Sequence, residues 1–259
     1  LPPYLEQIKM VLNLGSVREG ERLIYQGLPW EVTSLGFYSV FSNPALEGGT
    51  LRIPLKEVMG MISRRTDGKE PWFPTRPDDW TILEDGTYGK VIHQTPEQVV
   101  LLRLGGMRKT YLTSEFLEQN PENLMRGFRV TTRFGISYDH QAVATTEVAP
   151  VFQKALTAAF ISEFGRESVK AIKVEFAAAA SSSLDYLVLA DFSGELAHRM
   201  RYIERMMQRI CVDVCNHQDW NIPFPQITVH QAAPDSADDA GMMLDHPPHD
   251  AATPDSNTR

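Results

Sequence analysis

The run Leu184-Asp185-Tyr186-Leu187-Val188-Leu189-Ala190-Asp191-Phe192 is the most strongly apolar strand candidate in the chain. Its composition predicts a buried β-strand. A long helix is predicted directly after it, over about 194–217, because apolar residues recur there at spacings of four and three. These apolar residues form one continuous seam: Leu196, Met200, Ile203, Met207, Ile210 and Val214.

Similar patterns extend outward from this stretch on both sides. Alternating residues over 128–138 and 172–177 predict two half-buried strands, and Ile227 to His230 predicts a last one. The stretch 145–164 predicts a helix that ends at Gly165. The order is βαββαβ, the ferredoxin-like plan, over 127–230. The side chains expected to face the core are Val148, Phe152, Ala155, Ala159 and Phe164 of the helix and Ile172, Val174 and Phe176 of the second strand.

The first half of the chain contains a tandem repeat. Residues 23–32 align with 82–91 at an offset of 59, and 53–58 align with 111–116 at an offset of 58. Each block has a short strand, a glycine turn (Gly27, Gly86) and further strands, of which 35–41 is one. The pattern predicts two small Sm-like or SH3-like β-barrel units over 17–62 and 80–120, so the fold class is α+β. A Pro- and charge-rich linker, 63–79, separates them, and Trp72 and Phe73 are expected to fix it to a neighbouring surface.

Composition and charge restrict the function classes. The chain has 259 residues and a formal net charge of −8. Residues 231–259 hold six Asp and one Arg, a net −5, so the other 230 residues carry −3. A slightly acidic body argues against nucleic-acid binding by charge neutralisation. The tail, 231–259, is predicted to be disordered and acidic.

No catalytic, cofactor-binding or metal site is predicted, although four groups were weighed. The segment 245–250 could bind a metal, or it is a solvated part of the tail. Cys211 and Cys215 are either half of a metal site or small reduced core residues. The run Tyr138-Asp139-His140 is either a proton-transfer pair or a strand end with a helix-capping Asp. His217 lies at a helix C-terminus, where a cation is mildly favoured.

The N-terminus shows neither a signal peptide nor a complete membrane span. No window approaches the ~18 consecutive apolar residues of a transmembrane helix. Glu6 and Lys9 interrupt the first apolar run, and no basic leader precedes it. The chain begins at Leu1 and not at methionine, which indicates a processed or trimmed polypeptide.

Four short segments carry a resemblance to a known family. They are the hydrophobic-Pro-aromatic-Pro-Gln run Trp220-Asn221-Ile222-Pro223-Phe224-Pro225-Gln226-Ile227-Thr228-Val229, the entry Val17-Arg18-Glu19-Gly20-Glu21-Arg22-Leu23, the strand end Leu51-Arg52-Ile53-Pro54, and the strand Phe134-Gly135-Ile136-Ser137-Tyr138-Asp139. Together they resemble the cytoplasmic region of the MscS family of small-conductance mechanosensitive channels, over about residues 11–230. The family usually has one barrel where this chain has two, and Leu55 stands where an Asn commonly follows Ile-Pro.

The resemblance implies a homo-oligomeric ring, usually sevenfold, around a water-filled vestibule with side portals. Such a ring lies on the cytoplasmic side of an inner membrane, supports a pore that opens on membrane tension or osmotic downshock, and filters the ions that pass. Residues 1–16 would be the end of the pore helix, whose membrane-spanning part is absent. The segment expected to close the ring comprises Ile222, Pro223, Phe224, Pro225, Ile227 and Val229.

Two other functions remain open from the sequence. The first is a soluble Sm-like scaffold or RNA-binding module, for which the linker cations Arg64, Arg65, Lys69 and Arg76 would form a basic face. The second is a small enzyme on a ferredoxin-like fold, a plan that does not by itself decide activity.

Overall fold

The computed structural model describes residues 3–223. It contains three antiparallel sheets, and short helices follow the first two. The predicted α+β class is confirmed. The predicted last strand and the acidic tail lie outside the described residues.

The first sheet is a four-stranded meander that follows helix α1 (Pro3–Val11). Its first two strands are joined by Gln26 and Gly27, whose φ angles of 49° and 77° give the left-handed turn that matches strand twist. The elements are β1 (Arg22–Tyr25), β2 (Leu28–Ser34), β3 (Tyr38–Ser42), β4 (Thr50–Pro54) and the short helix α2 (Leu55–Val58).

The second sheet repeats this plan and adds one strand. Its strand order is β8-β7-β6-β5-β9. Gly86, at φ 77°, lies in the turn between β5 and β6, the first two strands of this sheet in the sequence. Matched elements begin at 22 and 80, 28 and 88, 38 and 98, 50 and 108, and 55 and 113, so the offset is 58 to 60 and the predicted repeat is confirmed. The elements are β5 (Trp80–Ile82), β6 (Tyr88–Gln94), β7 (Gln98–Arg103), β8 (Arg108–Leu112), α3 (Thr113–Glu118) and β9 (Glu122–Asn123).

Neither β unit closes into a complete barrel by strand pairing within 3–223. The strands β1 and β4 lie at opposite ends of the first hydrogen-bonding order, as β8 and β9 do in the second. The run 35–41, predicted as one strand, is also divided: Phe37 is 95% exposed in a turn, and β3 starts at Tyr38. The reason is the loop Leu35-Gly36-Phe37, which reverses the chain between β2 and β3.

The two β units share one core, and the linker between them completes it. Phe73 is buried and stacks on Phe116 of α3, with ring centroids 5.9 Å apart. The fully buried Gln94 donates from Nε2 to the carbonyls of Ala45 (2.6 Å) and Thr75 (3.0 Å), and its Oε1 accepts from the Thr75 hydroxyl (3.0 Å). One amide therefore joins the first unit, the linker and the second unit. The predicted fixing of the linker through Trp72 and Phe73 is confirmed, since Trp72 also packs under Arg22.

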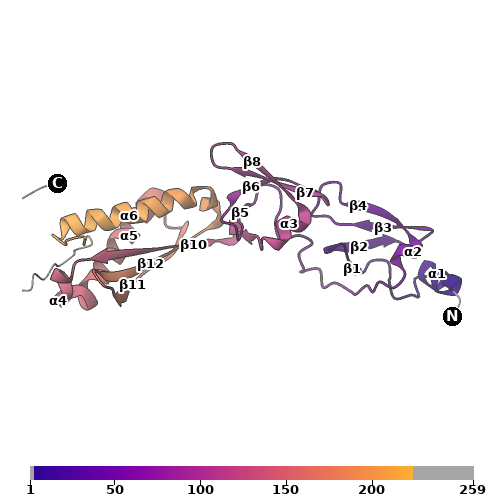
Figure 1. Ribbon diagram of the computed structural model, residues 1–259, viewed down its shortest axis with the longest axis horizontal. Helices are drawn as coiled ribbons and strands as arrows, with labels where there is room; N and C mark the ends of the chain where they lie inside the picture. Colours follow the sequence, from indigo (N-terminus) through magenta and orange to yellow (C-terminus); the bar gives the residue numbers. More distant parts are fainter. Residues whose placement is uncertain (1–2, 224–259) are drawn as a thin grey trace, which may run out of the picture. The chain divides into compact units, whose positions relative to one another are not determined.

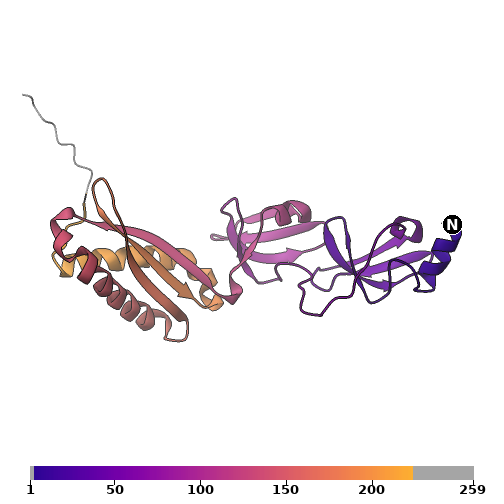
Figure 2. The same cartoon turned by 90° about the horizontal axis from the view of Figure 1, so that it is seen from below.

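The third sheet has the order β10-β12-β11, with β12 in the centre. Figures 1 and 2 show helices α5 and α6 lying over one face of it. Every second residue of β12 is buried, from Leu184 to Phe192, because these side chains meet the helices. The elements are β10 (Phe128–Ile136), α5 (Ala149–Phe164), β11 (Val169–Ala179), β12 (Leu184–Phe192) and α6 (Met200–His217).

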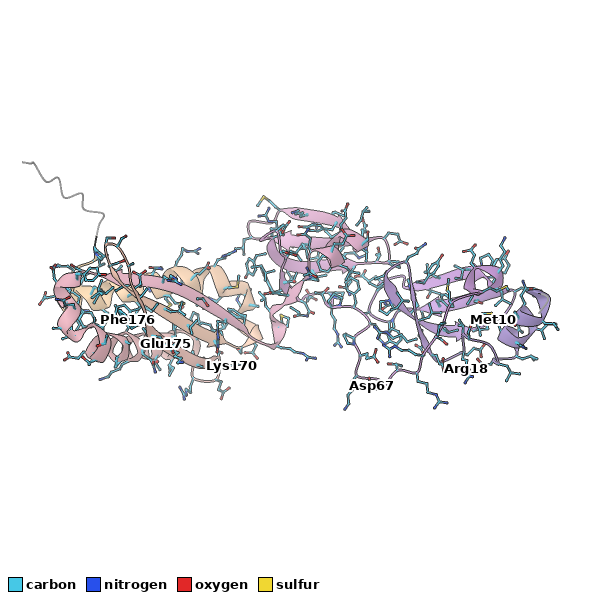
Figure 3. All side chains as sticks on the ribbon, turned by 60° about the horizontal axis from the view of Figure 1, so that its bottom comes forward. Met10, Arg18, Asp67, Lys170, Glu175 and Phe176 are labelled. Atoms are coloured by element: carbon cyan, nitrogen blue, oxygen red, sulfur yellow. The ribbon has the colours of Figure 1, made fainter. Side chains whose placement is uncertain are left out.

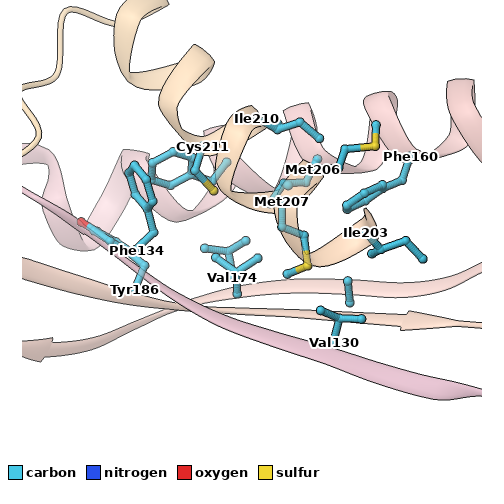
Figure 4. Packing of buried hydrophobic residues seen from close by; sticks show 14 of the residues in the cluster. Val130, Phe134, Phe160, Val174, Tyr186, Ile203, Met206, Met207, Ile210 and Cys211 are labelled. Atoms are coloured by element: carbon cyan, nitrogen blue, oxygen red, sulfur yellow. The ribbon is translucent and has the colours of Figure 1, made fainter. Parts of the chain in front are cut away.

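The predicted seam of the last helix is confirmed. Ile203, Met207 and Ile210 are buried against the sheet (Figure 4). Met200 and Val214 are buried as well. Leu196 precedes α6 in a 3-10 turn and is partly buried. The observed elements give βαββα of the predicted βαββαβ order.

Two of the predicted core faces are wrong in detail. Phe176 is 38% exposed (Figure 3) and Ile172 is only partly buried, whereas Val174 is buried. Ile172, Val174 and Phe176 pair in unbroken register with Ala190, Val188 and Tyr186, so they share the core face as predicted. The reason for their partial exposure is that β11 is an edge strand, with a neighbouring strand on one side. In α5 the most buried side chains are Phe152, Leu156 and Phe160, and the two predicted alanines, Ala155 and Ala159, lie beside that stripe.

We predict that Gln94→Ala destabilises the two β units by about 3 kcal/mol, because it leaves buried carbonyl and hydroxyl groups without partners. Urea unfolding followed by circular dichroism measures this loss. Gln98→Ala, at an exposed position on β7, is the matched control and should change stability by less than about 0.5 kcal/mol. Equal effects of both substitutions would show that the amide does not join the units.

Candidate functional site

The chain leaves α6 by a tight and well-anchored turn. Asp219 has a φ of 54°, and the Trp220 N–H donates to the Cys215 carbonyl over 2.9 Å. The Trp220 ring packs edge-on against Phe152 of α5, with centroids 5.7 Å apart. The first residues after the helix are therefore held on the core of the third sheet.

The next residue, Asn221, is bonded to the turn that follows β10. Its N–H donates to Nε2 of His140 (2.8 Å), and its carbonyl accepts from the Ser137 N–H (2.8 Å). Its side-chain amide donates to the Asp139 carboxylate over 3.4 Å. We call Ser137, Asp139, His140 and Asn221 the exit anchor, because they fix the position at which the chain leaves the domain.

The exit anchor decides one of the two interpretations of Tyr138-Asp139-His140. The Ser137 hydroxyl accepts from the Asp139 N–H, so the capping residue is Ser137 and the predicted capping role of Asp139 is wrong. Hydrogen bonds from Ser137 and Asn221 instead lower the pKa of the Asp139 carboxyl. The Tyr138 hydroxyl donates to the Ala180 carbonyl (2.7 Å), so it is engaged outside the anchor.

The predicted ring-closing segment begins at this anchor. Ile222 is 43% exposed, although it is apolar, and Pro223 is half-buried. Phe224, Pro225, Ile227 and Val229 lie outside the described residues. The described part of the segment is thus an apolar stretch that starts on a fixed support and is only partly covered by it.

The two cysteines are core residues. Cys211 and Cys215 are free and fully buried on α6. Burial raises the pKa of the Cys211 thiol to about 12 and that of Cys215 to about 11, with the neighbouring cysteine adding to the first shift. Within 3–223 no group of three acidic, His or Cys side chains could hold a metal ion. The burial of both thiols supports the interpretation of small reduced core residues, and the segment 245–250 lies outside the described residues.

One of the four linker cations is engaged in an ion pair within the linker. Arg64 pairs with Glu70, which also lies 3.6 Å from Arg22. Arg22, at the start of β1, covers the Trp72 ring and so helps to hold the linker. Charges are balanced on the open face of the third sheet as well: Arg129 bonds Asp191 (2.6 Å) and Lys173 lies 2.5 Å from Glu175.

Sequence reasoning missed an apolar groove at the N-terminal end of the first unit. It has a volume of about 630 Å³ and lies between α1 and the β2–β3 turn. Its exposed apolar side chains are Ile8, Val11, Leu12, Phe37 and Tyr38. The spacing of Ile8, Val11 and Leu12 on one helical face was the signal that could have revealed it.

A second groove, of about 650 Å³, lies between the two β units. Tyr25 and Leu51 line it from the first unit, and Glu97, Leu112 and Glu118 line it from the second.

No protein-family model and no curated protein sequence matches the chain. Among solved structures it is similar to the crystal structure of Helicobacter pylori MscS in its closed state, with a TM-score of 0.47 and 14% identity, over 62% of this chain and 60% of that one. It is also similar to the cryo-EM structure of Arabidopsis thaliana MSL1, with a TM-score of 0.43 and 10% identity, over 59% of this chain and 54% of that one. A variant of MSL1 gives a TM-score of 0.43 and 11% identity, over 59% and 56%. The chain thus spans little more than half the length of these proteins.

We predict that the thiols of Cys211 and Cys215 are unreactive in the folded protein, because they are buried and their pKa values are raised. Titration with a thiol reagent at pH 8 should detect fewer than about 0.1 thiols per chain in buffer and both in denaturant. Rapid reaction of either thiol in buffer would contradict the core assignment.

Proposed function

We propose that this chain forms the vestibule of a mechanosensitive channel of the MscS type. In this proposal, copies of the chain join in a ring, sevenfold by analogy, on the cytoplasmic side of a membrane. The ring supports a pore that opens under tension, and ions reach the pore through portals in its wall. The pore-lining helices belong to a part of the polypeptide outside this sequence.

The observation that carries the proposal is the anchored exit from α6. Asn221 is fixed by three hydrogen bonds, whereas the apolar Ile222 immediately after it is 43% exposed. A rigid support followed by an uncovered apolar residue favours a segment that is completed by contact with another chain. The Pro-Phe-Pro-Gln run that follows is the segment on which the family resemblance is most specific.

The β units support the same proposal. Small β units bury little apolar surface alone, so they gain by packing against neighbours. This chain joins two of them through one core and still leaves Phe37 and Leu12 exposed beside α1. A residual apolar face of this kind is typical of an assembling or membrane-proximal protein. Among the described residues no helix is sufficiently long and apolar to cross a bilayer.

The other two functions gain no specific support. An RNA-binding module requires a free basic face, and Arg64, one of the four linker cations, is paired with Glu70 instead. An enzyme requires convergent reactive groups in a pocket, and the two grooves of the β units offer an acidic rim and an apolar wall.

We predict that Ile222→Asp weakens assembly and leaves the fold of each chain intact, because Ile222 lies outside the core. Native mass spectrometry of the complete channel in detergent gives the subunit number, and circular dichroism gives the secondary structure. The wild type should appear as a closed ring, and the variant as smaller species with an unchanged spectrum.

Val212→Asp is the matched control, since Val212 is an apolar residue of α6 with 37% exposure, close to that of Ile222. It should leave the ring intact. A wild type that stays monomeric in the membrane, or a variant that assembles normally, would contradict the proposal. Pressure-activated currents in vesicles that contain the complete channel test the gating part of it separately.

A further inference from the structure

The bond between Asn221 and His140 fixes the protonation state of a histidine. A backbone N–H can only donate a hydrogen bond, so Nε2 of His140 must accept it over the observed 2.8 Å. An imidazole nitrogen accepts only when it carries no proton, and both nitrogens of the cationic form are donors. The exit anchor as observed therefore requires a neutral His140 with its proton on Nδ1.

The surroundings of His140 favour a change of partner when it gains a proton. Asp139, on the same turn, is the charged group that interacts with the His140 ring, and its own pKa is lowered, so it remains ionised in mildly acidic solution. The Asp185 carboxylate, on β12, accepts a hydrogen bond from the Ser183 hydroxyl (2.6 Å). The Ala180 carbonyl, just after β11, accepts one from the Tyr138 hydroxyl. The exit segment contributes Asp219 and the uncharged Asn221, and the exposed His217 ends α6.

We propose that His140 is a proton-operated latch for the segment that leaves α6. In its neutral form it holds the Asn221 N–H. On protonation it loses that bond, and the imidazolium is attracted to the Asp139 carboxylate, which also gives up the weaker 3.4 Å bond to the Asn221 side chain. Closed and released forms then differ in how firmly Asn221 and Ile222 are held.

Protonation of His140 opens the latch, so its closure depends on pH. The closed latch requires the unprotonated ring, so closure is favoured at high pH and is lost when the ring gains a proton as the pH falls. Release leaves Trp220 in place on Phe152, because that contact involves no titrating group. The latch itself does not depend on ring formation. An effect of the latch on assembly does depend on ring formation, and that consequence rests on the proposed function.

Nitrogen NMR of the chain labelled with 15N-histidine and 15N-asparagine tests the latch. At pH 8 the His140 ring should show the Nδ1–H tautomer, and between pH 8 and 5.5 the Asn221 amide should shift together with the ring. Its protection against hydrogen exchange, corrected for the intrinsic rate, should fall roughly threefold to tenfold, the change expected from one lost hydrogen bond. An Nε2–H tautomer at pH 8, or an Asn221 amide that does not change, would overturn the proposal.

Three variants make the assignment specific. His140→Gln keeps an acceptor without a titrating group and should abolish the pH dependence of the Asn221 signal. His217→Gln, at the exposed end of α6, is the matched control and should preserve it. Asp139→Asn should lower the midpoint, because the carboxylate no longer favours the charged ring. A transition that persists in His140→Gln would assign it to another group and overturn the latch, whereas a normal latch in a chain that forms no ring would contradict only the proposed function.

Discussion

The buried amide of Gln94 is the contact on which the two β units depend. A four-stranded meander of about 40 residues buries too little surface to be stable alone, and domains below about 40 residues usually need an additional support. Here the support is a shared core, and a shared core brings the carbonyls of Ala45 and Thr75 into an environment without water. Gln94 supplies the two donors and the acceptor that this environment requires. The linker between the units is thus part of the structure of both.

A second buried polar contact joins the second β unit to the domain of the third sheet. Tyr88 of β6 packs on Trp80, with ring centroids 4.9 Å apart, and its hydroxyl donates to the Ala197 carbonyl. Burial raises the pKa of Tyr88 to about 12, so the hydroxyl remains a donor at all physiological pH values. Nearby, Gly194 lies so close to Met125 that a Cβ there would be 1.8 Å from the Met125 carbonyl oxygen. Successive parts of the chain from 3 to 223 are therefore joined by buried polar contacts and close backbone packing.

The sequence predicted the elements well and the surfaces less well, for a physical reason. The seam of α6 was found because it is determined by a single periodic pattern, and β12 was found because its composition is strongly apolar. The repeat was found because two glycine turns recur at a constant offset. The exposure of Phe176 was not found, because it depends on the position of β11 at the edge of the sheet, which alternation within the strand does not reveal. The groove beside α1 was not found either, since exposure of Phe37 depends on where one turn divides the run 35–41. The role of His140 could not be derived, because its partner Asn221 lies 81 residues away in the sequence.

The exit anchor combines two requirements that normally conflict. A segment that pairs with other chains must start from a fixed position, or each copy would lose conformational entropy on assembly. It must also leave its apolar side chains uncovered. Asn221 meets the first requirement through backbone bonds at a strand end, and those bonds involve few apolar contacts, so Ile222 can remain exposed. A proton can weaken a support that is made of hydrogen bonds. The packing of Trp220 on Phe152 contains no titrating group, so a proton does not weaken it. Asn221, which the latch holds, comes directly after Trp220, which is held by packing. A response of the latch to pH is therefore confined to the segment that follows Trp220.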